Sequence, residues 1–171
     1  GNGVPQDDNE AVKWYRLSAE QGNAKSQYNL ARMYGEGRGV PQDDKEEVKW
    51  LRLAAEQGYA NAQNTLGWKY RRGQGVPQDY KEAVKWYRLS AEQGHANSQY
   101  ILGGMYYKGE GVPQDNKEAV KWYRLSAEQG DADAQSSLSD QYYKGEGVIQ
   151  DYILGHMWIN LSISQEKNNI K

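Results

Sequence analysis

The sequence contains no cysteine and no phenylalanine, and it has only four prolines and two histidines in 171 residues. Without cysteine, disulfide bridges, thiolate metal sites and cysteine nucleophiles are all excluded. No apolar run approaches the roughly 18 residues that a membrane span requires, and the mean hydropathy is −1.02. The 21 basic and 23 acidic residues leave a net charge of −2. This balance gives no electrostatic reason to expect binding to nucleic acid or to an anionic membrane.

What the sequence does contain is a short pattern repeated at a fixed spacing. The string Gly-Val-Pro-Gln-Asp begins at Gly3, Gly39, Gly75 and Gly111, and it returns as Gly-Val-Ile-Gln-Asp at Gly147. Each copy starts 36 residues after the previous one, and tryptophan recurs with the same spacing from Trp14 to Trp158. A period of 20–50 residues is typical of a solenoid, in which each unit buries its apolar face only against its neighbours.

Each repeat is predicted to form two helices. Asp43 is followed three residues later by Glu46, which is the spacing of a capping box at a helix start. Gly94 supplies the residue type that ends a helix, and the turn Gly109-Glu110-Gly111 leads to a proline that starts the next helix. The expected helices span residues 8–21, 24–36, 44–57, 62–72, 80–93, 96–108, 116–129, 132–144 and 152–164.

From Ala96 to Gly130 the patterns Ala-x5-Leu-Gly-x2-Tyr, Gly-x-Gly-Val and Ala-x2-Trp-Tyr follow one another, and together they resemble the Sel1-like repeat. That family is related to the tetratricopeptide repeats. The resemblance implies an all-α fold, a right-handed α/α superhelix (solenoid) of 36-residue helix-turn-helix repeats. The chain lacks the cysteine pairs of one branch of the family. It also departs from the pattern at four positions, which are Ala31, Glu47, Leu51 and Ser139.

We expect residues 1–166 to form a single repeat array. Its parts are a half repeat 1–22, the repeats 23–58, 59–94 and 95–130, a divergent C-terminal repeat 131–166, and a frayed tail 167–171. The array opens on the second helix of a repeat, so its N-terminal end is expected to expose Val12 or Trp14 to water. Self-association through this open end is one consequence.

The sequence predicts no catalytic residue, no cofactor and no metal site. The Gly-x-Gly turns lack the strand–loop–helix context of a phosphate-binding loop, and no Gly-x-Ser-x-Gly elbow is present. His95 occupies a position that varies between repeats and is interpreted as a tolerant surface site, and His156 as a residue of the terminal helix. A zinc site needs three or four converging ligands, and neither histidine has such neighbours in the sequence.

Positions that vary from repeat to repeat are free to contact a partner, because all repeats share the same packing task. By resemblance to tetratricopeptide arrays, the first helix of each repeat lines the concave side. Its variable positions are rich in Tyr, Trp and Arg, the residue types that dominate binding hot spots, although single exposed aromatics are also normal on a protein surface. The predicted partner-binding residues are Tyr28, Arg32, Trp68, Arg71, Arg72, Tyr100, Tyr107, Lys108 and Tyr143.

We therefore expect a non-enzymatic scaffold or adaptor that binds a segment of another protein in this groove. Basic residues exceed acidic ones on the face, so the expected segment is acidic or bears a carboxylate. The alternative is a protein that binds a glycan or cell-wall fragment, in which Trp68, Tyr100 and Tyr107 stack on sugar rings. The resemblance is to a bacterial family, some of whose members are exported, and it favours a periplasmic or secreted protein.

Overall fold

The computed structural model describes residues 7–169, with side chains for residues 7–165. Within residues 7–169 the chain forms nine helices and no strand, which confirms the predicted all-α fold and its 36-residue repeat. The helices are α1 Asp8–Glu20, α2 Ala24–Glu36, α3 Asp44–Glu56, α4 Ala60–Arg72, α5 Tyr80–Glu92, α6 Ala96–Lys108, α7 Asn116–Glu128, α8 Ala132–Lys144 and α9 Tyr152–Asn169.

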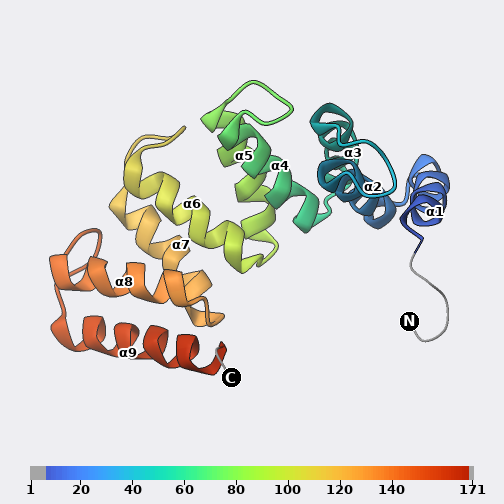
Figure 1. Ribbon diagram of the computed structural model, residues 1–171. Coiled ribbons are helices and arrows are strands. Elements are labelled where there is room, and N and C mark those ends of the chain that lie inside the picture. Colours follow the sequence, from blue (N-terminus) through green and yellow to red (C-terminus); the bar gives the residue numbers. More distant parts are fainter. Residues whose placement is uncertain (1–6, 170–171) are drawn as a thin grey trace. The chain divides into compact units, whose positions relative to one another are not determined.

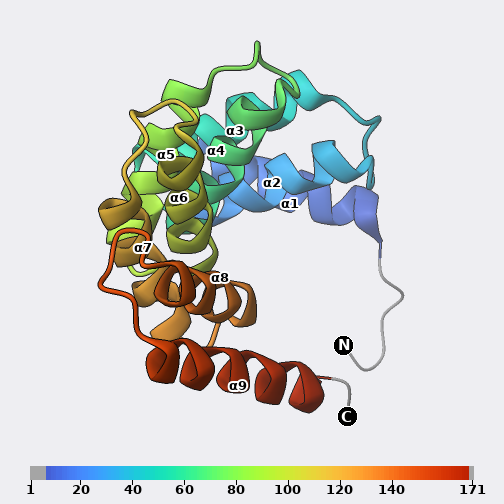
Figure 2. The same cartoon turned by 90° about the vertical axis from the view of Figure 1, so that its left-hand side faces the viewer.

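The helices fall into two compact units, each of which stacks helices in chain order. Unit 1 ends at Asp79 and contains α1 to α4, and unit 2 begins at Tyr80 and contains α5 to α9. In both units every helix packs against the next one along the chain. In unit 2, for example, α7, α8 and α9 lie side by side in both views (Figures 1 and 2).

The starts of α1, α3 and α7 are capped by aspartate, but the expected capping box is only half present at Asp43. Asp43 accepts hydrogen bonds from the backbone N–H groups of Lys45 and Glu46, at 2.9 and 3.1 Å. The backbone N–H of Asp43 itself donates to the carbonyl of Tyr34 in the preceding helix, at 3.1 Å. Because that donor is already satisfied, Glu46 does not reach back to it and instead pairs with Lys49 at 2.9 Å.

The Gly-x-Gly turns are structural, as their recurrence predicts. Gly109 ends α6 in the left-handed conformation with φ +71°. At Gly111, with φ +75°, a Cβ atom would lie 2.3 Å from the carbonyl oxygen of Tyr80 at the start of α5. The turn after the first helix of a repeat therefore rests directly on the second helix of the preceding repeat, and only glycine permits this approach.

Two helix boundaries differ from the sequence prediction by more than one residue. Helix α4 begins at Ala60 rather than at residue 62, because the turn at Gly58 (φ +87°) sets the start whether or not a good cap residue follows. Helix α9 continues to Asn169 rather than ending at 164, since no glycine or proline follows to stop it. The expected frayed tail thus begins as helix, and residues 170 and 171 lie outside the described part.

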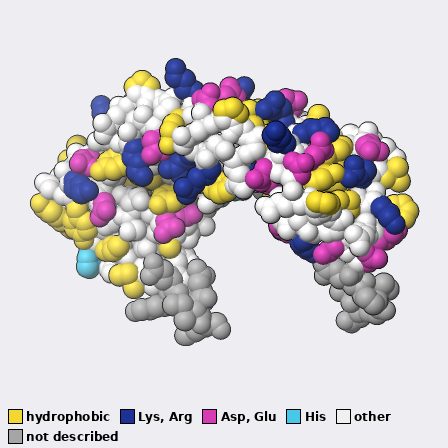
Figure 3. Space-filling model, turned by 45° about the horizontal axis from the view of Figure 1, so that its top comes forward, with side chains coloured by type: hydrophobic (Ala, Val, Ile, Leu, Met, Phe, Trp, Pro, Cys, Tyr) yellow, Lys and Arg dark blue, Asp and Glu magenta, His cyan; other side chains and the backbone are white. Residues whose placement is uncertain are grey.

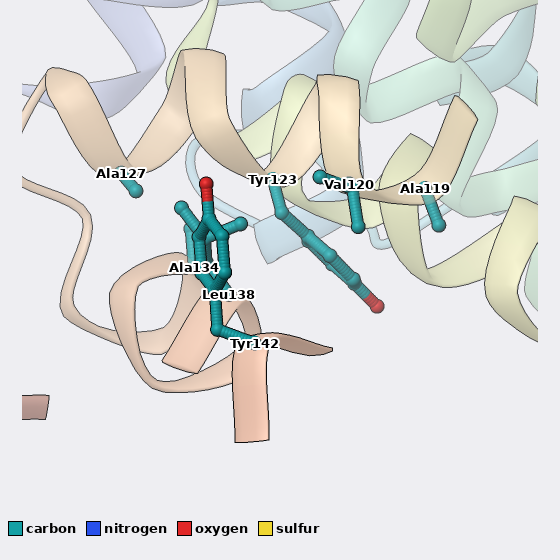
Figure 4. Close-up of a cluster of buried hydrophobic side chains, with 7 residues drawn as sticks. All are labelled: Ala119, Val120, Tyr123, Ala127, Ala134, Leu138 and Tyr142. Atoms are coloured by element: carbon teal, nitrogen blue, oxygen red, sulfur yellow. The ribbon is translucent and has the colours of Figure 1, made fainter. Parts of the chain in front are cut away.

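The core of each unit is built from the positions that stay constant between repeats. Leu30 and Leu66 in unit 1, and Leu102 and Leu138 in unit 2, have no exposed surface. In unit 2 a cluster of buried side chains fills the space between α7 and α8 (Figure 4). Its members are Ala119, Val120, Tyr123, Ala127, Ala134, Leu138 and Tyr142.

The departures at Ala31 and Leu51 follow from a size exchange between two facing positions. In unit 2 the equivalent residues are Gly103 and Tyr123, and a Cβ atom on Gly103 would lie 2.7 Å from the Tyr123 ring. A tyrosine in the second position therefore requires a glycine in the first. Where the second residue is the shorter Leu51, the first can be Ala31, and both are completely buried.

The N-terminal helix carries an exposed tryptophan. Trp14 is 63% exposed, whereas Trp50, Trp86 and Trp122 at equivalent positions are each 7% exposed. Val12, by contrast, is buried, so the expectation of exposure is confirmed for Trp14 and wrong for Val12. The reason is that the turn at Gly39 packs against α1 and covers the valine side of the helix.

Candidate partner-binding site

Unit 1 has a pocket of about 340 Å³ between α2, α3 and α4. Three of the residues predicted to bind a partner lie in its wall, and these are Tyr28, Arg32 and Trp68. The other residues of the wall and floor are Gly35, Glu36, Glu47, Thr65, Lys69 and Gln74. The repeat comparison therefore selected side chains that come together in space, although it did not predict the pocket itself.

Two helices present the rim of the pocket in fixed positions. Tyr28 and Arg32 are one turn apart on α2, and the Tyr28 ring lies 5.3 Å from the ring of Tyr59. Arg32 forms an ion pair with Glu36 at 2.8 Å, and this hydrogen bond raises the pKa of Arg32 and lowers that of Glu36. Trp68 on α4 remains 39% exposed, so a large apolar surface faces solvent at the mouth of the pocket.

The floor of the pocket is a buried ion pair that sequence reasoning missed. Glu47 and Lys69 are 6% and 4% exposed, and the Lys69 Nζ lies 2.5 Å from the Glu47 Oε2 and 3.3 Å from Asp44 Oδ1. Burial raises the pKa of Glu47, and the neighbouring Lys69 opposes that rise. A Cβ atom on Gly35 would lie 2.5 Å from the same carboxylate, so the missing side chain at Gly35 makes room for it.

The sequence held a signal for this pair in two departures from the repeat. Glu47 stands where Ala83 and Ala119 stand in other repeats, and Lys69 stands where the apolar Met105 stands. Each departure alone is an ordinary substitution. Only the fold shows that the two positions face each other across α3 and α4, so that a carboxylate and an ammonium group replace an apolar contact.

The charges around the pocket are nearly balanced, and the positive excess lies beside it. Arg32 and Lys69 are offset by Glu36 and Glu47 within the lining. The Lys69 ammonium also lies 5.3 Å from the centre of the Trp68 ring, which orients the indole through a cation–π contact. The last turn of α4 is basic and carries the other two predicted residues of this unit, the half-buried Arg71 and the exposed Arg72.

In unit 2 the predicted binding residues also contribute to packing. Tyr100 and Tyr107 are half-buried against the core cluster, and the Tyr100 ring lies 5.9 Å from that of Tyr123. Burial raises the pKa of Tyr123 well above its usual range. Tyr143 is likewise half-buried, with its ring 6.1 Å from that of Tyr152. These tyrosines are half-buried, whereas Trp68 is 39% exposed, and Lys108 is the exposed member of the unit 2 set.

His95 has a structural role that the sequence interpretation missed. It is the N-cap residue of α6, where its Nδ1 accepts a hydrogen bond from the backbone N–H of Ser98 at 3.3 Å. Asn23 and Asp131 cap helices at the equivalent positions of other repeats. The presence of these two capping residue types at this repeat position could have indicated the role of His95. Burial lowers the pKa of His95, and protonation would remove the acceptor. Its contribution to stability is therefore present above pH 6.5 and is lost as the pH falls below that value.

The described residues hold no group of three or more His, Cys, Asp or Glu side chains placed to bind a metal ion. Over the same residues, no helix combines the length and the apolar composition needed to cross a membrane.

The stacked helix pairs repeat every 36 residues, which places the chain in the class of α-helical repeat proteins. Variable aromatic and basic side chains surround the pocket of unit 1. Within this class the chain belongs to the Sel1 repeat family, whose model matches residues 1–23, 24–59, 60–95, 96–131 and 132–166. Proteins of this family are non-enzymatic repeat scaffolds that generally mediate protein–protein interactions.

Solved structures of bacterial proteins share the fold. A protective antigen of uropathogenic Escherichia coli with an SLR fold is 46% identical, with a TM-score of 0.94 over 96% of this chain and 35% of the antigen. A Sel1 repeat protein from Oxalobacter formigenes is 39% identical, with a TM-score of 0.91 over 95% of this chain and 67% of that protein. Cysteine rich protein B of Helicobacter pylori is 25% identical, with a TM-score of 0.59 over 78% of this chain and 97% of that protein.

The chain thus spans about a third of the length of the E. coli antigen that it matches. No curated protein matches the chain significantly.

Proposed function

We propose that this protein is a scaffold that binds a segment of a partner protein on the α2–α4 face of unit 1, with Trp68 as the central contact. The observation that carries the proposal is the position of Trp68, which is 39% exposed at the mouth of a pocket although it belongs to a helix whose other large apolar side chain, Leu66, is completely buried. Tryptophan and arginine are the residues that most often contribute large binding energies at protein interfaces.

The pocket suits a single apolar or aromatic side chain of the partner. Its volume of about 340 Å³ lies at the small end of the range for ligand sites. The Tyr28 and Trp68 rings supply apolar walls, while Arg32 offers N–H donors that can bind a backbone carbonyl of an extended segment. Because Arg32 is held by Glu36, little side-chain entropy is lost when the segment binds.

The chemistry of the flanking residues favours an acidic segment. The pocket lining itself is balanced, so the preference for negative charge comes from the exposed Arg72 at the end of α4. A carboxylate of the partner near the Arg72 guanidinium group would gain charge-assisted hydrogen bonds at the protein surface. The contact is exposed, so we expect it to affect the association rate and its salt dependence more than the affinity.

Selection from a library of displayed peptides tests this proposal. We expect peptides that pair an aromatic or large aliphatic residue with aspartate or glutamate, and we expect Trp68→Ala to weaken their binding by about 30-fold or more, the effect of a hot-spot residue. Trp14→Ala is the matched control, because Trp14 is an exposed tryptophan of the same unit that lies outside the pocket. Affinities measured by calorimetry give the comparison.

Two results would contradict the proposal. In the first, peptides bind equally well to the wild type and to Trp68→Ala, which places their site elsewhere. In the second, no peptide is selected and a soluble cell-wall saccharide at millimolar concentration is bound instead. The second result would favour the glycan alternative, which Tyr100 and Tyr107 support less well because both rings are half-buried.

A further inference from the structure

Helix α9 exposes a line of apolar side chains, two of which stand where the other repeats expose lysine. Ile149 in the preceding turn and Ile153, Met157 and Leu161 on the helix are 91%, 82%, 42% and 41% exposed. These four residues, called the α9 stripe below, are spaced four positions apart, and the three that belong to the helix therefore lie along one side of it. Hydrophobic side chains gather at the left edge of the view in Figure 3, at the end of unit 2 that α8 and α9 form.

Comparison with α7 shows that two positions of the stripe change from a charged to an apolar residue although they are exposed in the other repeats. Ile153 and Met157 replace Lys117 and Lys121 of the previous repeat. Both lysines are exposed even though α8 and α9 follow α7 in the stack. A further helix pair stacked on α9 in the same way would therefore leave Ile153 and Met157 exposed. Another repeat would not bury these two residues.

We propose that the α9 stripe is a dimer interface that binds the same stripe of a second copy of this chain. The argument for a second copy is charge: no Asp, Glu, Lys or Arg occurs between Asp151 and Glu166, so two copies of this face meet without repulsion. The absence of Lys and Arg also disfavours an anionic membrane as the occupant. The corresponding faces of α5 and α7 carry lysine, so among these three helices α9 alone presents this apolar face, and the contact closes at two copies.

Two-fold symmetry fixes which residues meet. When the two-fold axis is perpendicular to the helices, two copies of α9 lie side by side and run antiparallel. With the axis at the centre of the helical part of the stripe, Met157 packs against Met157 of the second copy, and Ile153 packs against its Leu161. The stripe exposes on the order of 500 Å² per copy, the size of the largest apolar patch on a typical monomer. Burial of the whole stripe in both copies would give about 1,000 Å², near the lower limit for a specific interface. Because Ile149 has no partner in this register, the buried area is smaller, and we expect a weak dimer.

Sedimentation analysis of the whole chain tests the interface. We expect the wild type to shift reversibly from one chain to two between about 1 µM and about 300 µM, the range that suits an interface of this size. The variant Ile153→Lys/Met157→Lys restores the residues of the other repeats and places like charges opposite each other, so its dimerisation should weaken at least tenfold. Circular dichroism should show unchanged helicity, because lysine already occupies these positions in α5 and α7.

A matched control carries the same two new charges at the other end of the chain. Trp14→Lys/Leu17→Lys replaces two exposed apolar residues of α1, and we expect it to dimerise like the wild type. If this variant is monomeric while the stripe variant dimerises, self-association occurs through the N-terminal end and the stripe proposal is wrong. A wild type that stays monomeric throughout, or one that forms a series larger than dimers, overturns the proposal as well.

Single-cysteine variants test the register, because the sequence has no cysteine of its own. Met157→Cys should form an intermolecular disulfide rapidly on mild oxidation, since symmetry brings the two Cα atoms of residue 157 close together and a disulfide spans only about 4.4–6.8 Å between them. Leu17→Cys is the control and should cross-link no faster than random collision allows. Equal rates for the two variants would contradict the predicted register.

Discussion

Replacing Lys69 by methionine is expected to lower the free energy of unfolding by about 3–5 kcal/mol, which is the usual cost of leaving one charge of a buried pair without its partner. Both members of the pair are nearly inaccessible to water, and their charged atoms lie 2.5 Å apart. Methionine fits the site, since Met105 occupies the equivalent position and is completely buried. The loss therefore reports on Glu47 and not on a clash. Chemical denaturation monitored by circular dichroism measures it.

The double variant Glu47→Ala/Lys69→Met is the control for this prediction. It recreates the pair Ala83 and Met105 of the next repeat, both of which have no exposed surface. We expect it to recover most of the lost stability, because apolar replacements of buried ion pairs are often neutral or stabilising. A double variant as unstable as Lys69→Met would contradict the assignment of the loss to the unpaired charge.

The penalty in Lys69→Met should also depend on pH. Burial raises the pKa of Glu47 in the folded protein, and removing Lys69 removes the interaction that opposes this rise. The folded state of the variant then binds a proton more tightly than the unfolded state, whose carboxyl keeps its usual pKa of 4.5. The variant should therefore lose stability, relative to the wild type, as the pH rises above that value.

Replacing Gly111 by alanine is expected to destabilise the protein by more than about 3 kcal/mol, and it can prevent unit 2 from folding. Two costs add together at this residue. Its φ of +75° costs a non-glycine residue roughly 1–2 kcal/mol, and the new Cβ atom would lie 2.3 Å from the backbone oxygen of Tyr80. A backbone atom at the start of a helix cannot move aside as the end of a side chain can.

Gly109→Ala separates the two costs because it shares the conformation but not the contact. Gly109 has φ +71°, yet the atoms nearest to an added Cβ lie at ordinary distances of 3.4 Å or more. We expect it to lose only the conformational part, roughly 1–2 kcal/mol. Equal losses for the two variants, measured by thermal unfolding, would show that the turn does not rest on α5 as closely as described.

Most of the fold could be predicted because equivalent positions of the repeats can be compared with one another within this one sequence. Positions that never change, such as Leu102 and Leu138, had to be core, and both are completely buried. The glycines that end helices were equally clear, since few other residues adopt φ near +70°. Boundaries without a glycine or a proline were less certain, and α9 accordingly runs past its expected end.

The candidate site was only partly predictable, for reasons of geometry and of chemistry. Tyr28, Arg32 and Trp68 were selected because they vary, and they do meet at one pocket. The pair of Glu47 and Lys69 was missed because its members lie in different helices and each looks like a single surface substitution. Variation alone also cannot separate a binding residue from one that adjusts packing, and half-buried Tyr107 and Tyr143 show the overlap.

The central claim, that Trp68 is the contact between this protein and a partner segment, is tested most directly by nuclear magnetic resonance of the tryptophan indole N–H groups. The chain has six tryptophans, and Trp68→Phe assigns the signal of Trp68. Titration with a selected acidic peptide should shift that signal, while the signals of Trp14 and of the buried Trp50, Trp86 and Trp122 stay in place. A peptide that shifts Trp14 and leaves Trp68 unchanged would contradict the account.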